Sequence, residues 1–312
     1  MVFLSRILRV EVCKQSLLTL RKTTGHSFQH CKKALEQTEN DLSKAVGWLE
    51  TKALEEGWTK LERTGGRAAH QGVLAMAGRG SNLVAVTEIS CETDFVSRNA
   101  ELRDFAHGVS ETIWQEARNE NSSSVTKART LPWEKIAKLV LNGQSVEDGR
   151  ARLVTKVGEN VSFRQSVLVT AGEGERLAAS CHPDVFFGKY GAVVVYKGGD
   201  DEIADKVCRH IIGMKPSSIG KVEDLHKKLE KRDAIEEVQA NSSKELTLEN
   251  LDEDAGEAVP AEQNKDNEER LLLQDFVFDP DTTVGELLQE NDMEITKFWR
   301  LECAHEVVEN KD

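Results

Sequence analysis

The sequence predicts an α+β fold, in which a small N-terminal helical domain precedes a core of two subdomains, each an antiparallel sheet backed by helices. Three observations support this. Apolar residues recur at helical spacing through residues 16–54, two β-rich runs at 72–77 and 83–90 are separated by a glycine-rich turn, and residues 163–170 alternate between apolar and polar side chains. With 312 residues, the chain is long enough for such units.

The N-terminal segment, residues 1–15, has the composition of a mitochondrial presequence. Arg6, Arg9 and Lys14 are accompanied by a single acid, Glu11, among many apolar residues. A basic, acid-poor and amphipathic segment is typical of such signals. An ordinary first helix is the alternative.

Residues 16–54 predict a compact three-helix docking domain. Thr24–Gly25 ends its first helix, and Asp41 is placed to cap its third. The apolar positions of the three helices are Leu17 and Leu20, then Phe28, Cys31 and Leu35, then Leu42, Ala45, Val46 and Leu49. Residues 55–70, which include Gly57, Gly65 and Gly66, predict a connector to the core whose stiffness the sequence leaves open.

Residues 71–152 predict the first core subdomain. The runs at 72–77 and 83–90 flank Gly78–Ser81, a natural hairpin connection. The turn Cys91–Val96 follows, and then a helix capped by Asn99. The buried stripe of that helix is Leu102, Phe105, Ala106, Val109 and Ile113. A short helix over 133–141 follows Pro132.

Residues 153–312 predict the second core subdomain. Strands are expected over 163–170, 177–182, 191–197 and 298–303, and helices over 203–214 and 284–291. Residues 228–270 are dominated by Glu, Asp, Asn and Ser, so we expect an acidic surface excursion that is partly helical and partly disordered.

The bulk composition excludes several classes of protein. A net charge of −13 argues against direct nucleic-acid or membrane-surface binding, because both need clustered Lys and Arg. No apolar run approaches the roughly 20 residues that cross a bilayer. The six cysteines lie far apart without a CxxC pair, which favours a reducing compartment over a disulfide framework.

No catalytic or cofactor-binding constellation is visible in the sequence. Gly188–Lys189 is not a phosphate loop, because Pro183 replaces the leading glycine and Tyr190 replaces the Ser/Thr. The histidines and cysteines lack the spacing of metal ligands. We therefore expect a protein that is not an enzyme and that needs no cofactor or metal.

The turn Cys91–Val96 is the most informative segment. Asp94 and Phe95 place a carboxylate beside a large aromatic ring between two regular elements. Such a pair is useful if both side chains act on another molecule, since an aromatic buried in a partner contributes about 1.5–3 kcal/mol. The alternative is that Phe95 packs into its own core and Asp94 caps the next helix, although Asn99 already supplies a cap there.

The chain resembles the elongation factor Ts family, the guanine-nucleotide exchange factors for elongation factor Tu. The resemblance covers almost the whole chain after the presequence, except the acidic excursion, and several motifs occur in the family's order. They are Leu20–Gly25, Cys31–Leu35, Asp41–Leu49, Glu92–Asn99, Gly158–Val161, His182–Val193, Met214–Pro216 and Val284–Leu288. Residues 16–54 are similar to the family's ubiquitin-associated-type domain.

The resemblance implies a mechanism. An aspartate and a phenylalanine that match Asp94 and Phe95 wedge into the nucleotide-binding domain of elongation factor Tu and disturb its magnesium ion and phosphate loop. The partner is expected to be mitochondrial elongation factor Tu, GDP-bound and nucleotide-free, in the mitochondrial matrix. The residues that the resemblance assigns to partner binding are Thr93, Asp94, Phe95, Val96, Arg21, Phe28, Val157, Gly158 and His182. Gln29, beside Phe28, is more polar than is common in the family.

Two alternatives come from other classes. The three-helix domain could bind ubiquitin and make the chain an adaptor or scaffold, although Thr24–Gly25–His26 is more polar than the usual loop of such binders. Cys91 or Cys181 could be the nucleophile of an enzyme, which would require a histidine partner close in space.

Overall fold

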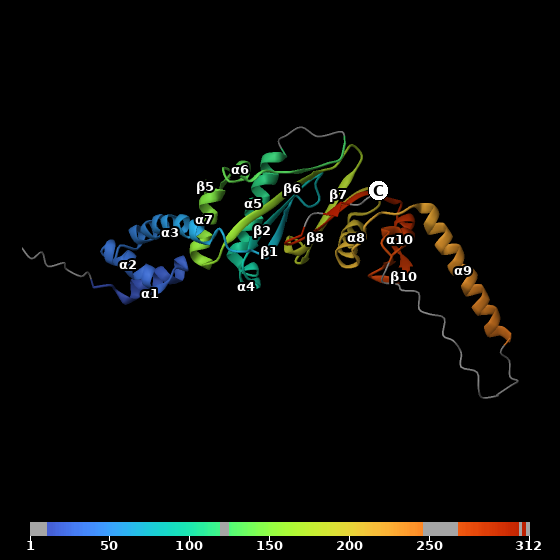
Figure 1. Cartoon of the computed structure of the whole chain (residues 1–312), viewed down its shortest axis with the longest axis horizontal. Helices are drawn as coiled ribbons and strands as arrows, with labels where there is room; N and C mark the ends of the chain where they lie inside the picture. Colours follow the sequence, from blue (N-terminus) through green and yellow to red (C-terminus); the bar gives the residue numbers. More distant parts are fainter. Residues whose placement is uncertain (1–10, 119–124, 246–267, 306–307, 310–312) are drawn as a thin grey trace, which may run out of the picture.

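The computed structural model describes residues 11–118, 125–245, 268–305 and 308–309. The molecule is elongated, with helices α1–α3 at one end and helix α9 projecting from the other (Figure 1). Residues 1–10 of the expected presequence and residues 246–267 of the acidic excursion lie outside the described residues.

The N-terminal domain contains the three expected helices. They are α1 (Lys14–Thr24), α2 (Phe28–Gln37) and α3 (Leu42–Thr64). Leu20, Cys31 and Leu35 are buried in its core. The folded domain begins earlier than the expected Ser16, because the Asn40 side chain donates to the carbonyl of Glu11 and Val12 packs against the same core.

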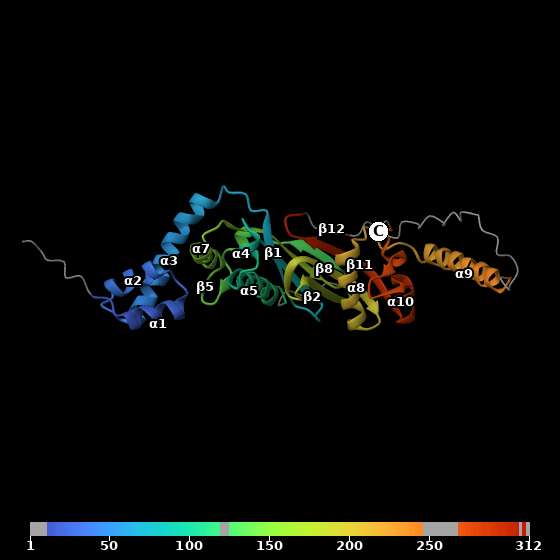
Figure 2. The same cartoon turned by 90° about the horizontal axis from the view of Figure 1, so that it is seen from below.

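Helix α3 forms most of the expected connector. Residues 55–64 continue the helix, and Gly65 follows it. Leu61 is buried against the main core, so tertiary packing keeps this half of α3 helical despite the glycine at 57. Figure 2 shows α3 passing from α1 and α2 toward α7 and the start of β1.

One antiparallel sheet forms the centre of the core. Its strand order is β12-β11-β8-β1-β2-β6-β3, with β7 also paired to β8. The expected hairpin is confirmed, since β1 and β2 pair antiparallel. The strands are β1 (Gln71–Ala77), β2 (Leu83–Cys91), β3 (Lys127–Thr130), β6 (Val161–Thr170), β7 (Arg176–Pro183), β8 (Phe187–Gly198), β11 (Met293–Glu302) and β12 (Val308–Glu309).

The α+β class with antiparallel strands is confirmed, but the sheet is not divided as expected. Leu74 and Ala75 of β1 pair with Gly188 and Phe187 of β8, which joins the two halves into one sheet. Strand β6, expected in the second subdomain, pairs with β2 in the first half. A single buried cluster contains side chains from both halves, so the halves share a core.

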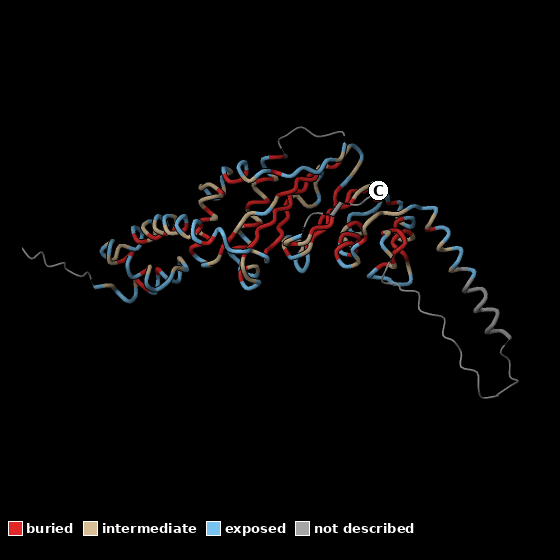
Figure 3. Tube along the Cα trace, in the orientation of Figure 1, coloured by how far each residue is buried: buried red, intermediate tan, exposed pale blue. Residues whose placement is uncertain are grey.

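Helices cover the outer faces of the sheet, and the strands between them are mostly buried (red in Figure 3). Helices α5 (Ala100–Ala117) and α7 (Val146–Val157) pack with the first half, and α8 (Asp201–Met214) and α10 (Val284–Glu290) pack with the second. Helix α6 (Trp133–Ile136) is shorter than expected, because the chain turns into the hairpin β4 (Val140–Leu141) and β5 (Gln144–Ser145).

Helix α9 (Val222–Glu245) forms the described part of the acidic excursion. Leu225 anchors its first turn in the core beside the 3₁₀ turn η2 (Leu271–Leu273). The hairpin of β9 (Asp275–Phe276) and β10 (Asp279–Thr283) follows η2. Among the described helices, none is both long and apolar enough to span a membrane.

Candidate partner-binding site

The segment after β2 folds into a one-turn helix, α4 (Asp94–Ser97), at the edge of the core (Figure 1). Thr93 caps it, because its Oγ1 accepts a hydrogen bond from the backbone N–H of Val96. Ser97 donates from Oγ to the carbonyl of Asp94. Arg103 of α5 donates to the carbonyl of Ser97, so α4 is also tied to the longer helix behind it.

The two apolar side chains of α4 point in opposite directions. Phe95 is 83% exposed, the most exposed large apolar residue of the described part, whereas Val96 is buried among β1, β2 and α5. The alternative that Phe95 packs into its own core is therefore wrong. Val96 was expected to contact the partner, but its burial makes it the anchor that holds α4 on the core.

Glu159 clamps the start of this turn. Its carboxylate accepts two hydrogen bonds from Thr93, at 3.0 Å from the backbone N and at 2.6 Å from Oγ1. A second bond links the same two segments, because Oε1 of Glu92 accepts a hydrogen bond from the backbone N–H of Asn160 at 2.7 Å. These bonds bring Val157–Gly158 next to α4, although 66 residues separate Thr93 from Glu159. Sequence reasoning missed the role of Glu159, whose only signal was its place in the Gly158–Val161 motif.

Gly158 has a backbone that requires glycine. It closes α7 in the left-handed conformation, with φ of +78°, and its N–H donates to the carbonyl of Val154. This cap turns the chain sharply, so that Glu159 points back at Thr93. Val157 is half-buried and Gly158 is exposed beside the turn.

Asp94 lies on the exposed side of α4. Its carboxylate pairs with Arg98 at 3.2 Å, and both side chains are at least half exposed to solvent. Such a pair contributes little to stability, so a partner can replace Arg98 as the neighbour of Asp94 at small cost.

The docking domain carries two more of the expected contact residues. Arg21 and Phe28 are exposed on the two sides of the turn that joins α1 to α2, and Phe28 is 49% exposed. Gly25 in the left-handed conformation makes this turn tight. Ser27 caps α2 and so fixes where Phe28 begins the helix.

His182 is exposed at the end of β7, in the other half of the sheet. The loop after it reaches back to the first half. Phe186, which is 43% exposed, accepts a hydrogen bond at its carbonyl from Met76 of β1, and its ring meets His107 of α5 at 5.7 Å.

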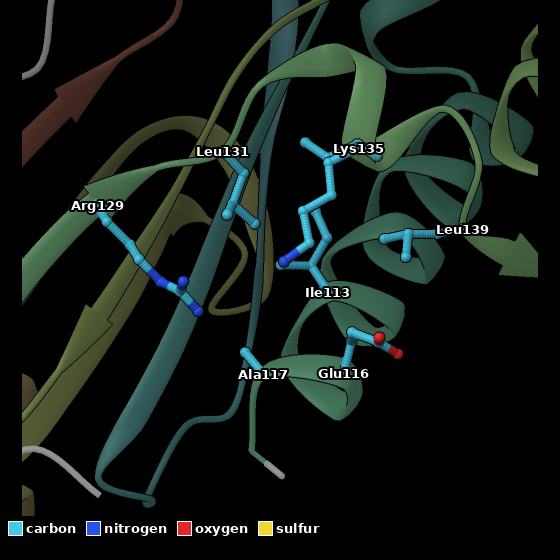
Figure 4. A pocket seen from close by; sticks show the side chains of 8 residues that line it. Ile113, Glu116, Ala117, Arg129, Leu131, Lys135 and Leu139 are labelled. Atoms are coloured by element: carbon cyan, nitrogen blue, oxygen red, sulfur yellow. The ribbon is translucent and has the colours of Figure 1, made fainter. Parts of the chain in front are cut away.

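Of the hollows in the described part, one lies between the end of α5, β3 and α6 and another lies beside the docking domain. The first, of about 10 Å³, holds a single water at most. Glu116, Arg129 and Lys135 surround an apolar floor there (Figure 4). The other is a cleft of about 650 Å³ between the docking domain and helices α5 and α7. Thr24 and His26 line the cleft, so an adaptor that used the Thr24–His26 loop would have to bind inside it.

The cysteine hypothesis is not supported by the environments of its two residues. Burial raises the pKa of the Cys91 thiol to about 12, with Glu159 nearby adding to the effect. Burial also raises the pKa of Cys181 well above its ordinary value. Neither thiol would be a thiolate at neutral pH. Within the part of the chain that the structure describes, no three His, Cys, Asp or Glu side chains are grouped to hold a metal ion.

Comparisons with known proteins agree on one family. The family model described as "Elongation factor TS" matches residues 92–305, and the one described as "Elongation factor Ts, mitochondrial, N-terminal" matches residues 2–59. The chain is similar to proteins named "Elongation factor Ts, mitochondrial". The one from Aedes aegypti is 34% identical over 94% of this chain and 89% of its own length. The one from Salmo salar is 31% identical over 93% and 86%. The one from Caenorhabditis elegans is 30% identical over 95% and 93%.

Proposed function

The chain belongs to the elongation factor Ts family, and on this basis we propose that it promotes GDP release from elongation factor Tu during mitochondrial translation. The observation that carries the proposal is that the Phe95 ring is exposed, while the turn that carries it is fixed by the buried Val96 and by the two hydrogen bonds from Thr93 to Glu159. An apolar ring left in solvent by an otherwise well-anchored element is suited to insertion into another protein.

The proposed mechanism is exchange by differential binding. A protein that binds the nucleotide-free partner more tightly than the GDP-bound partner must, by reciprocity, weaken GDP binding by the same factor. Phe95 supplies the difference if its ring fits only a rearranged nucleotide pocket. Asp94 adds a negative charge that disfavours a phosphate group nearby. No bond of the nucleotide is broken in this step.

Thr93 and Val96 then support the turn, and Thr93, which is partly exposed, remains part of the proposed contact surface. Thr93 uses its hydroxyl in both directions, accepting from Val96 and donating to Glu159. A turn fixed in this way loses little conformational entropy when its ring is bound, so more of the contact energy is available to shift the partner.

Arg21 and Phe28 form the proposed second contact, on the docking domain. Two contacts on one chain make the second binding event intramolecular, which raises affinity without new interactions. Val157, Gly158 and His182 complete the proposed surface on the core, where all three are at least partly exposed.

The mitochondrial compartment is supported by the three relatives described above, each named "Elongation factor Ts, mitochondrial". We place the chain in the matrix, where it would meet mitochondrial elongation factor Tu. The basic residues of segment 1–10 are the proposed targeting signal.

The direct test of the function is the dissociation of fluorescent GDP from mitochondrial elongation factor Tu, followed by stopped flow. The proposal predicts that the release rate rises with the concentration of this chain and reaches a plateau. A release rate that stays at the value for elongation factor Tu alone would end the proposal.

Phe28→Ala is expected to weaken binding to the partner without changing the maximal rate of GDP release. Losing this ring should raise the concentration for half-maximal stimulation by about three- to tenfold, because an interface residue of this kind contributes about 1 kcal/mol or more. The plateau rate should not change, since Phe95 is untouched. Leu42→Ala is the control, because Leu42 is an exposed apolar residue (37%) of the same domain. A lower plateau with an unchanged half-maximal concentration would contradict the docking role.

A further inference from the structure

Helix α3 belongs to two hydrophobic cores at once. Its buried residues include Ala45, Leu49, Ala53, Gly57 and Leu61, spaced four apart. Ala45 and Leu49 pack in the core of the docking domain, and Leu61 packs in the main core. Since successive residues of an α-helix are about 100° apart, this stripe turns by about 160° between Ala45 and Leu61. The two cores therefore lie on nearly opposite sides of one rigid rod.

At Gly57 the backbone of α3 lies directly against the backbone of α7. A Cβ atom built on Gly57 would lie 2.1 Å from the carbonyl oxygen of Ala151 in α7 and 3.0 Å from Oγ1 of Thr155. Any side chain at position 57 would therefore push α3 away from the backbone of α7. Gly47, in the same helix, has nothing within 4 Å of its built Cβ.

Hydrogen bonds across the same contact hold the two helices in register. Thr155 donates from Oγ1 to the carbonyl of Ala53 at 2.9 Å, and Lys60 donates from Nζ to the carbonyl of Thr155 at 3.1 Å. Thr155 is buried, so its bond to Ala53 is shielded from water, whereas the bond from Lys60 is only partly buried. We call the contact of Ala53, Gly57 and Lys60 with Ala151 and Thr155 the α3–α7 lock.

Helix α7 continues directly from this lock to the Phe95 turn. After Thr155 it ends at Gly158, and Glu159 then holds Thr93 through two hydrogen bonds. The path from Phe28 to Phe95 thus runs through α3, the lock, the end of α7 and the Glu159 clamp.

We propose that Gly57 is a positioning residue, which lets α3 lock onto α7 and so fixes the docking helices at one distance and orientation from the Phe95 turn. The proposal rests on the proposed function, in which Phe28 and Phe95 engage the same partner. With both contacts held at a fixed separation, binding at one raises the effective concentration of the other. The cleft of about 650 Å³ is the space that the lock keeps between the two bodies.

The test compares two glycine-to-alanine changes in one helix. Alanine is the better helix former, so neither Gly57→Ala nor Gly47→Ala should melt α3. Gly57→Ala is expected to raise the concentration of this chain that gives half-maximal stimulation of GDP release by about tenfold, because effective concentration depends steeply on geometry. The plateau rate should not change. Gly47→Ala should behave like the unchanged protein. If the two variants give the same half-maximal concentration, the proposal is wrong.

A second readout needs no partner. Cys13 is exposed, whereas the other five cysteines are buried, so a spin label can be attached to it selectively. A second label on the exposed end of α5, introduced by Glu116→Cys, allows the distance distribution between the two bodies to be measured. We expect a narrow distribution for the unchanged protein and for Gly47→Ala, and a shifted or broadened one for Gly57→Ala. An unaltered distribution in Gly57→Ala would overturn the proposal, even if exchange had changed.

Thr155→Val is the variant to use if Gly57→Ala does not fold. Valine keeps the shape of threonine and removes the hydroxyl that donates to the carbonyls of Ala53 and Ala151. The same shift should therefore appear at about two- to tenfold, as expected for the loss of a neutral hydrogen bond. A Thr155→Val protein with unchanged distances and half-maximal concentration would contradict the lock. Absence of any stimulated release by the unchanged protein would end the proposed function, while the distance measurement would still test the lock.

Discussion

Phe95→Ala is expected to slow the stimulated release of GDP from elongation factor Tu by about tenfold to a hundredfold. Burying a phenylalanine ring in a partner contributes about 1.5–3 kcal/mol, and each 1.36 kcal/mol corresponds to a factor of ten in rate. Because the ring is 83% exposed in the free chain, its removal leaves no cavity, and the free energy of unfolding should change by less than about 0.5 kcal/mol.

The measurement is the plateau rate of fluorescent GDP release, together with denaturant unfolding of the free protein. Phe95→Leu should fall between the unchanged protein and Phe95→Ala, because leucine keeps part of the apolar volume. Val140→Ala is the matched control, since Val140 is a strongly exposed apolar residue (66%) on the β4–β5 hairpin. A Phe95→Ala protein with an undiminished plateau would remove the ring from the mechanism.

Glu159→Ala is expected to have the second largest effect. The change removes the carboxylate that accepts both hydrogen bonds from Thr93. Each hydrogen bond to a charged group contributes about 1.5–3 kcal/mol. The turn that carries Asp94 and Phe95 would then sample other conformations. The plateau rate should fall by about tenfold, and the free energy of unfolding should fall by about 3 kcal/mol or more.

A double-mutant cycle separates positioning from general destabilisation. If Glu159 acts by holding the Phe95 turn, Glu159→Ala should lower the plateau rate much less when Phe95→Ala is already present. Glu159→Gln keeps an acceptor oxygen and should be intermediate. Glu173→Ala, at an exposed turn between β6 and β7, is the control for loss of one surface charge. Fully additive effects of Glu159→Ala and Phe95→Ala would contradict the clamp.

The elements with clear periodicity were predictable from the sequence. The β1–β2 hairpin, helix α5 and its Asn99 cap, strand β6 and helix α8 all occur where the spacing of apolar residues placed them. The joining of the two halves was not predictable, because it depends on β1 meeting β8 across more than 110 residues at only two residue pairs. Local patterning carries no information on such a contact.

Gly57 shows why the stiffness of the connector over residues 55–70 was not predictable from the sequence. Glycine lowers helix propensity, so the three glycines in that stretch left open whether the connector is a rigid helix or a flexible chain. At Gly57 the missing side chain instead permits two helices to touch. A glycine for flexibility and a glycine for close packing look the same until the neighbouring helix is known.

In the candidate site, too, some residues were predictable from the sequence and others were not. Asp94 and Phe95 could be identified from the sequence, because an aromatic beside a carboxylate in a turn has few purely structural uses. Val96 looked like a contact residue in the same motif, yet it is buried. Glu159 could not be assigned, since its role depends on the fold bringing it to Thr93.

The most direct test of the account compares the affinity of this chain for nucleotide-free and for GDP-bound elongation factor Tu by calorimetry. Exchange by differential binding requires tighter binding to the nucleotide-free form, and Phe95→Ala should reduce that preference while leaving affinity for the GDP-bound form nearly unchanged. Equal affinity for the two forms would contradict the account, because a protein that binds both equally cannot shift the nucleotide equilibrium.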